Sequence, residues 1–243
     1  MAEETSSDSQ KNINMEATAH DQSKVTMVGQ MQANTVIIVT AQRDGKPFQA
    51  PTLPSYNIDR PEITQKLQTR LFNSSNNCGL VLSAIHGLGG IGKTTLAIAL
   101  AHDEEAKKIF ADGVLWTILG KTPDLLGLLS NWIQALGDYD FRPTTVDAAS
   151  SHLRTLLYDK AVMLVVDDAW DQEHIKPFLV GGQKCQLIIT TRRPDIASEV
   201  GAELYQLDLM TEEESLALFT RILGRELEEK EIEEVKLLAE AVG

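Results

Sequence analysis

Residues 86–97 read HGLGGIGKTTLA, and the apolar run LVLSAI of residues 80–85 comes directly before them. The segment fits the phosphate-binding pattern G-x-x-x-x-G-K-[ST], with Lys93 and Thr94 in its last two places. Glycines let the chain turn so that successive backbone N–H groups point at phosphate oxygens, and the dipole of a following helix attracts the same oxygens. The sequence predicts a strand before this loop and a helix after it, which is the order that a phosphate-binding loop requires.

Two side chains of the loop have separate predicted roles. Lys93 is expected to reach the β- and γ-phosphates of a nucleotide, and the Thr94 hydroxyl is expected to be a ligand of Mg²⁺. The alternative, a glycine-rich turn that lies near a lysine by chance, leaves the flanking strand and helix unexplained. The predicted nucleotide contacts of the loop are Gly87, Leu88, Gly89, Gly90, Ile91, Gly92, Lys93, Thr94 and Thr95.

An acidic pair ends the apolar run LVVDD of residues 164–168. A carboxylate at the end of a buried strand is costly unless a metal ion or hydrogen bonds pair it. We therefore expect Asp167 to hold Mg²⁺ through water, and Asp168 to orient or deprotonate an attacking water as a catalytic group. The alternative is that either aspartate caps the next helix.

A third strand, IITT of residues 188–191, ends in Arg192 and Arg193. If this strand is inserted between the acidic strand and the strand before the loop, Arg192 faces the γ-phosphate and responds to its presence. The alternative is a surface arginine in an ion pair. That second interpretation is the one we give to Arg193.

Composition limits the partners that this chain can have. Its 243 residues suffice for one sizeable domain with appendages. It has 22 Lys and Arg against 35 Asp and Glu, a formal net charge of −13, so nucleic acid is a poor partner. No stretch approaches the roughly 20 apolar residues that cross a membrane, and the polar, acidic start is unlike a signal peptide, so we expect a cytoplasmic protein. The two cysteines and five histidines lack the spacing of a disulfide framework or structural metal site.

The order of patterns predicts four regions. Residues 1–24 are polar and are not expected to order alone, and residues 25–54 are expected to form a β-hairpin (strand 35–40, turn 44–45) and a Pro-rich linker. Residues 55–210 alternate apolar strands with helices, which predicts a parallel sheet covered on both faces. One of these helices is predicted to have Thr122 as its N-cap. Residues 211–243 predict two acidic helices, the first with a capping box from Thr211 and Glu214.

Together, the segments resemble the NB-ARC family of the signal-transduction ATPases with numerous domains (STAND), which includes relatives of apoptosome scaffolds and plant disease-resistance proteins. GLGGIGKTTLA is similar to the family's Walker A loop, LVVDDAWD to its acidic Walker B strand, LIITTR to its sensor strand, and YQLDLMTEEESLALF to the passage into its first helical subdomain. YNIDRPE, residues 56–62, resembles its adenine-contacting segment, although Asp59 stands where a glycine is usual and Glu62 is displaced by one position. The resemblance makes Arg60 a candidate contact near the base.

The resemblance implies a P-loop NTPase fold with sheet order 5-1-4-3-2. It also implies that ADP marks a closed resting state, and that exchange for ATP opens the protein for self-association and for binding of signalling partners. The sequence ends before the family's Gly-Leu-Pro-Leu motif, so we expect a truncated chain, and the Pro-rich linker suggests a prokaryotic member.

Three functions are compatible with these features. The first is a signalling switch that binds ATP or ADP with Mg²⁺ and is at most a slow ATPase, since the short carboxylate of Asp168 would position water poorly. The second is a small-molecule kinase or another P-loop ATPase, but the sequence shows no arginine-rich lid segment. The third is a non-catalytic nucleotide-binding interaction fragment.

Overall fold

The computed structural model describes residues 14–18, 24–28, 46–73, 80–84 and 92–242. They belong to two units, Met1–Gly45 and Lys46–Gly243. In the first unit, strands β1 (Asn14–Thr18) and β2 (Lys24–Val28) pair antiparallel, with Met15 opposite Met27.

This strand pair differs from the sequence expectation, because β1 lies within residues 1–24, for which no order is predicted. The stretches MEA at 15–17 and VTM at 25–27 alternate apolar and polar residues, which is the period of a strand and is easily overlooked over so few residues. The hairpin predicted from residues 35–40 and the turn at 44–45 lies outside the described residues.

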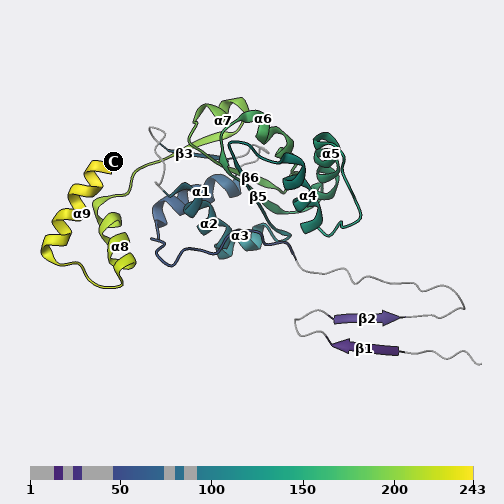
Figure 1. Ribbon diagram of the computed structural model, residues 1–243, viewed down its shortest axis with the longest axis horizontal. Coiled ribbons are helices and arrows are strands. Elements are labelled where there is room, and N and C mark those ends of the chain that lie inside the picture. The colour runs from purple at the N-terminus through teal and green to yellow at the C-terminus, as the bar shows by residue number, and fades with distance from the viewer. Residues whose placement is uncertain (1–13, 19–23, 29–45, 74–79, 85–91, 243) are drawn as a thin grey trace, which may run out of the picture. The chain divides into compact units, whose positions relative to one another are not determined.

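The second unit is built on one sheet of five parallel strands (Figure 1). The strands are β3 (Leu80–Ala84), β4 (Gly113–Gly120), β5 (Val162–Ala169), β6 (Gln186–Thr191) and β7 (Glu203–Leu207). Their order across the sheet is β4-β5-β6-β3-β7. Numbered from β3 and read from the β7 edge, this order is 5-1-4-3-2, and it places β3 and β5 on either side of β6.

Helices cover both faces of this sheet, as the uninterrupted apolar strands predict. Val114 and Trp116 of β4 belong to one buried cluster, together with residues of α1, α2 and α3, while Leu115 between them belongs to a second cluster with residues of α4 to α7. Figure 1 shows the same division. The helices are α1 (Pro61–Asn73), α2 (Lys93–His102), α3 (Glu104–Ile109), α4 (Leu125–Ala135), α5 (Val146–Leu157), α6 (Gln172–Ile175), the 3-10 helix η2 (Lys176–Phe178), α7 (Asp195–Glu199), α8 (Glu212–Leu223) and α9 (Glu229–Val242). None of those in the described part of the chain combines the length and apolarity needed to cross a membrane.

The segment predicted to be a linker begins the second unit instead. The Val114 N–H donates to the Pro47 carbonyl at 2.8 Å, and the Gln49 N–H donates to the Val114 carbonyl at 3.0 Å. Gly113 permits this approach, because its φ is +118° and a Cβ there would lie 2.2 Å from the Pro47 oxygen. Prolines cannot continue a central strand, but β4 is an edge strand and accepts a short partner beside it.

Two helix starts test the capping predictions. For α4 the predicted cap was wrong, since the Asp124 side chain, not Thr122, accepts from the Gly127 N–H at 3.1 Å. A carboxylate two residues further along competes successfully for the same first-turn amides. For α8 the prediction is confirmed, with Thr211 and Glu214 forming both hydrogen bonds of the capping box.

Candidate nucleotide-binding site

Parallel strands present their carboxyl ends at one edge of the sheet, where open α/β folds bind ligands. At this edge the ends of β5 and β6 and the start of α2 surround a pocket of about 180 Å³. The described residues that line it are Gly92, Lys93, Thr94, Thr95, Asp168, Thr190, Thr191 and Arg192. The pocket therefore receives residues from all three segments singled out in the sequence: the end of the glycine-rich loop, the acidic pair after β5's apolar run, and the end of β6 with Arg192.

The start of α2 is suited to an anion. Gly92 precedes the helix with a φ of +92°, a left-handed conformation that favours glycine. It has no side chain with which to cap the first-turn amides, and amides left open at a helix N-terminus attract phosphate oxygens. The predicted contacts from Gly87 to Ile91 lie outside the described residues and remain predictions.

Asp167 and Thr94, the two predicted metal ligands, are in contact. The Asp167 side chain is buried, and its Oδ1 accepts from the Thr94 hydroxyl at 2.8 Å. Carboxylate and hydroxyl oxygens are hard ligands of the kind that Mg²⁺ prefers. A buried carboxylate joined to the residue that follows the loop lysine therefore fits a nucleotide-bound Mg²⁺.

Thr190 is a site residue that the sequence analysis missed. Its hydroxyl donates to Asp167 Oδ1 at 2.5 Å and accepts from the Asp168 N–H at 3.0 Å, so it fixes both members of the acidic pair. The available signal was a hydroxyl residue near the end of the strand that carries Arg192.

Asp168 has an unusual backbone. Its φ is +52°, the only positive value for a non-glycine among the described residues, and the register between β5 and β6 is interrupted from Val166 to Ala169. Such a conformation costs on the order of 1 kcal/mol or more, and it is enriched at functional sites. The turn places Asp168 in the lining of the pocket, while Asp167 is turned toward Thr94 and Thr190.

Two cationic side chains line the same pocket. Burial lowers the pKa of Lys93, and the positive charge of Arg192 lowers it further, against the opposing influence of Asp168 and Asp167. Cations that disfavour each other are both stabilised when a polyanion binds between them. The structure therefore brings Lys93, Asp167 and Arg192 to one site.

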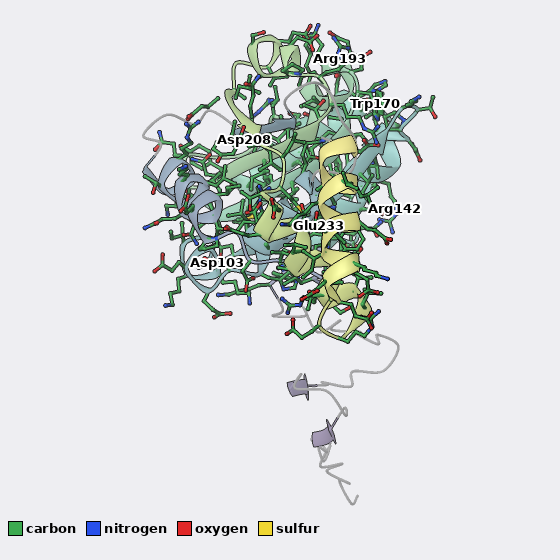
Figure 2. All side chains as sticks on the ribbon, turned by 90° about the vertical axis from the view of Figure 1, so that its left-hand side faces the viewer. Asp103, Arg142, Trp170, Arg193, Asp208 and Glu233 are labelled. Carbon is green, nitrogen blue, oxygen red and sulfur yellow. The ribbon has the colours of Figure 1, made fainter. Side chains whose placement is uncertain are left out.

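Arg192 is also held from outside the pocket. Its guanidinium carbon lies 5.4 Å from the centre of the Trp170 ring, and Lys121 Nζ lies 4.8 Å from the same centre. Arg193 forms the predicted surface ion pair with Asp195 and donates to the Trp170 carbonyl at 3.1 Å; Figure 2 labels Arg193 and Trp170.

A second pocket, of about 390 Å³, adjoins the first, because Gly92 and Thr95 line both. Its remaining lining comes largely from the YNIDRP segment, from α2 and from the region of α8, and includes Asn57, Arg60 and Leu218. Arg60 lines this pocket, and its guanidinium donates to Glu214; its predicted contact near the base stays a prediction. A largely apolar pocket beside a phosphate site has the form of a nucleoside site.

The fold and this pair of pockets define the class of P-loop nucleotide-binding proteins. Within that class, the chain belongs to the NB-ARC domain family, whose model matches residues 60–228. All described lining residues of the first pocket fall within this range, and those of the second pocket do so apart from residue 53 and residues 56–59.

Known proteins agree with the assignment. The chain is 35% identical over 189 residues to the regulatory protein AfsR of Streptomyces griseus, covering 74% of this chain and 19% of AfsR. It is 28% identical over 169 residues to disease resistance RPP13-like protein 4 of Arabidopsis thaliana, covering 65% of this chain and 19% of that protein. The chain thus spans about a fifth of the length of these relatives.

Among solved structures, a STAND protein with a tetratricopeptide repeat sensor from Pyrococcus horikoshii is similar, with a TM-score of 0.49 and 17% identity. That match covers 79% of this chain and 29% of the other. The ORC2 protein of Aeropyrum pernix is similar with a TM-score of 0.44 and 15% identity, over 70% of this chain and 51% of the other.

Proposed function

We propose that this chain is the nucleotide-binding part of a signalling switch that holds ADP at rest and exchanges it for ATP with Mg²⁺. In the ATP state it would associate with itself and with signalling proteins. The observation that carries the proposal is that Lys93 and Arg192 line one pocket whose lining residues Thr94 and Thr190 hydrogen-bond to Asp167, and that a larger pocket adjoins it.

Each residue has a distinct role in this proposal. Lys93 and the first-turn amides of α2 bind the β-phosphate, which both nucleotides share. Thr94 and Asp167 hold Mg²⁺, which neutralises charge on the phosphates. Arg192 contacts the γ-phosphate and so distinguishes ATP from ADP.

Asp168 is the proposed catalytic base for slow ATP hydrolysis. It lines the pocket beside Lys93 and Arg192, whereas Asp167 hydrogen-bonds with Thr94 and Thr190, which leaves one carboxylate for the metal and one for water. An Asp168→Asn variant should keep nucleotide binding and lose hydrolysis, which single-turnover measurements with labelled ATP would detect.

Lys93→Ala tests nucleotide retention directly. The purified protein is extracted with acid and the extract is chromatographed. We expect ADP in the extract of the unaltered chain and its loss in Lys93→Ala, because the cation that offsets the phosphate charge is removed. Lys107→Ala is the matched control, since Lys107 is a surface residue of α3 paired with Glu104.

Two results would refute the switch. Lys93→Ala that retains as much ADP as the control would show that the phosphate pocket does not bind the nucleotide. Steady turnover near the roughly 10 s⁻¹ of metabolic enzymes would replace the switch with an ordinary ATPase or kinase.

A further inference from the structure

The larger pocket, which we call the nucleoside pocket, has walls from the α/β body, including α2, and from the region of α8. Asn57 and Arg60 line it from the segment before α1, whereas Met210 and Leu218 line it from the end of the β7–α8 connection and from α8 itself. The shape of the pocket therefore depends on how α8 is attached to the α/β body.

Arg60 is a major attachment between these parts. Its Nε donates to Glu214 Oε1 at 2.9 Å, and its Nη2 donates to the Leu209 carbonyl at 3.1 Å and to the Asp208 carbonyl at 3.4 Å. The Arg60 side chain is only 8% exposed. A guanidinium removed from water to this degree requires such charge-assisted partners. Removing the carboxylate of Glu214 alone would leave the buried charge of Arg60 without its ion-pair partner, which is destabilising.

The two carboxylate oxygens of Glu214 accept hydrogen bonds from different residues. Oε1 accepts from Arg60, while Oε2 accepts from the Thr211 N–H at 2.9 Å as part of the capping box of α8. The Thr211 hydroxyl in turn accepts from the Glu214 N–H at 3.1 Å. One side chain therefore fixes both the start of α8 and a residue in the pocket wall.

A second hydrogen bond joins α8 to the segment before α1, between residues that do not line the pocket. Arg221 Nε donates to the Ser55 carbonyl at 3.1 Å. In the described part of the chain, neither Arg221 nor Ser55 lines the pocket. This contact joins the same two parts without contributing to the nucleoside wall, and so offers a control.

We propose that Glu214 is a positioning residue for nucleotide binding: through Arg60, occupation of the pocket and attachment of α8 stabilise each other. The proposal rests on the proposed function, since it takes the occupant to be the nucleoside part of ADP or ATP. Coupling between two sites is reciprocal, so nucleotide should protect α8 from opening to the degree that attachment of α8 tightens nucleotide binding.

The test compares Glu214→Gln with Thr211→Ala in the full chain. Glutamine can still accept from the Thr211 N–H, as it does in other capping boxes, but it lacks the charge that pairs with Arg60. Thr211→Ala removes the hydroxyl cap and leaves the Arg60 ion pair in place. Arg221→Ala removes the other attachment.

Two quantities are measured for each protein: the dissociation constant of ADP by calorimetry, and amide hydrogen exchange of α8 with and without ADP. For Glu214→Gln we expect ADP binding about tenfold weaker, within the usual range of coupling between sites, and no slowing of α8 exchange by ADP. For Thr211→Ala and Arg221→Ala we expect faster α8 exchange, still slowed by ADP, with affinity within about twofold of the unaltered chain.

The outcomes separate this proposal from the proposed function. If Glu214→Gln binds ADP as tightly as the unaltered chain, the link is refuted while the nucleotide site stands. If Thr211→Ala weakens ADP binding as much as Glu214→Gln does, stability of the helix start is responsible and the link is again refuted. If the unaltered chain does not bind ADP, both proposals fail.

Discussion

At the scale of single residues, the indole of Trp170 is shared by two cations. Arg192 and Lys121 both lie within cation–π distance of the ring, and Arg192 also lines the pocket at the carboxyl ends of β5 and β6. Since a cation over an indole is stabilised by about 0.5–1 kcal/mol at an exposed site, Trp170 helps to hold Arg192 where it reaches the pocket.

Trp170→Leu should therefore weaken the binding of ATP more than the binding of ADP. We expect a loss of about threefold in the preference for ATP, because only ATP has the phosphate that Arg192 contacts in our proposal. Competition titrations with both nucleotides measure it. Lys121→Met is the control and should leave the preference unchanged; an equal loss for ATP and ADP in Trp170→Leu would contradict a role specific to Arg192.

The site residues differ in how far the sequence revealed them. Lys93, Thr94 and Asp167 could be predicted because their types and spacing are those that phosphate and metal binding require. Thr190 was missed because a threonine near the end of a strand is common, and only its contact with Asp167 distinguishes it. For Arg60 the family resemblance predicted a contact near the base but gave no indication of Glu214, 154 positions away.

At the scale of secondary-structure elements, the start of α4 distinguishes two neighbouring cap candidates. Asp124→Ala should lower the free energy of unfolding by about 1 kcal/mol, because the Gly127 N–H loses its acceptor. Thr122→Ala should change it by less than about 0.5 kcal/mol, as is usual for surface positions. Urea unfolding of both variants measures the two losses. A larger loss in Thr122→Ala than in Asp124→Ala would show that Thr122 is the cap.

The connection between α4 and α5 should respond to acid. Hydrogen bonds from the Phe141 N–H and from His152 hold the pKa of Asp138 below its ordinary value of 3.8. A carboxyl with a lowered pKa in the folded state stabilises the fold above its unfolded pKa, and this stabilisation is lost as pH falls through the folded value.

Asp138→Asn should therefore be less stable than the unaltered chain at pH 6, and the difference should shrink as pH falls below about 4. Urea unfolding across this range measures it. Asp159→Asn, at an exposed position, gives the baseline. A difference that stays constant down to the lowest pH would mean that ionisation of Asp138 does not contribute.

At the scale of the whole molecule, the boundary of the nucleotide-binding unit lies before the prolines rather than after them. Pro47 and Gln49 hydrogen-bond with the edge strand β4, and the Pro51 carbonyl lies 2.9 Å from His102 Nε2 of α2. This segment protects an edge that would otherwise present unpaired backbone groups.

A chain that begins at Lys46 should accordingly fold with the stability of the full chain. One that begins at Ser55 should lose about 2 kcal/mol or more, about 1 kcal/mol for each of the two backbone hydrogen bonds to Val114. Thermal and urea unfolding of the two chains test this. If the chain that begins at Ser55 is as stable as the one that begins at Lys46, residues 46–54 act only as a linker.

The sequence by itself determined the features that are coded locally: the start of α2 after the glycine-rich segment, the apolar strands of a two-sided sheet, the capping box of α8, and the polar ends of β5 and β6. Each depends on residues that lie within a few positions of one another, so its pattern can be recognised in the sequence before the fold is known. The tertiary structure alone decided the contacts between distant segments: Pro47 with Val114, Thr190 with Asp167, and Arg60 with Glu214. A backbone amide, a hydroxyl or a guanidinium can be satisfied by many partners, and only folding selects which one comes within hydrogen-bonding distance.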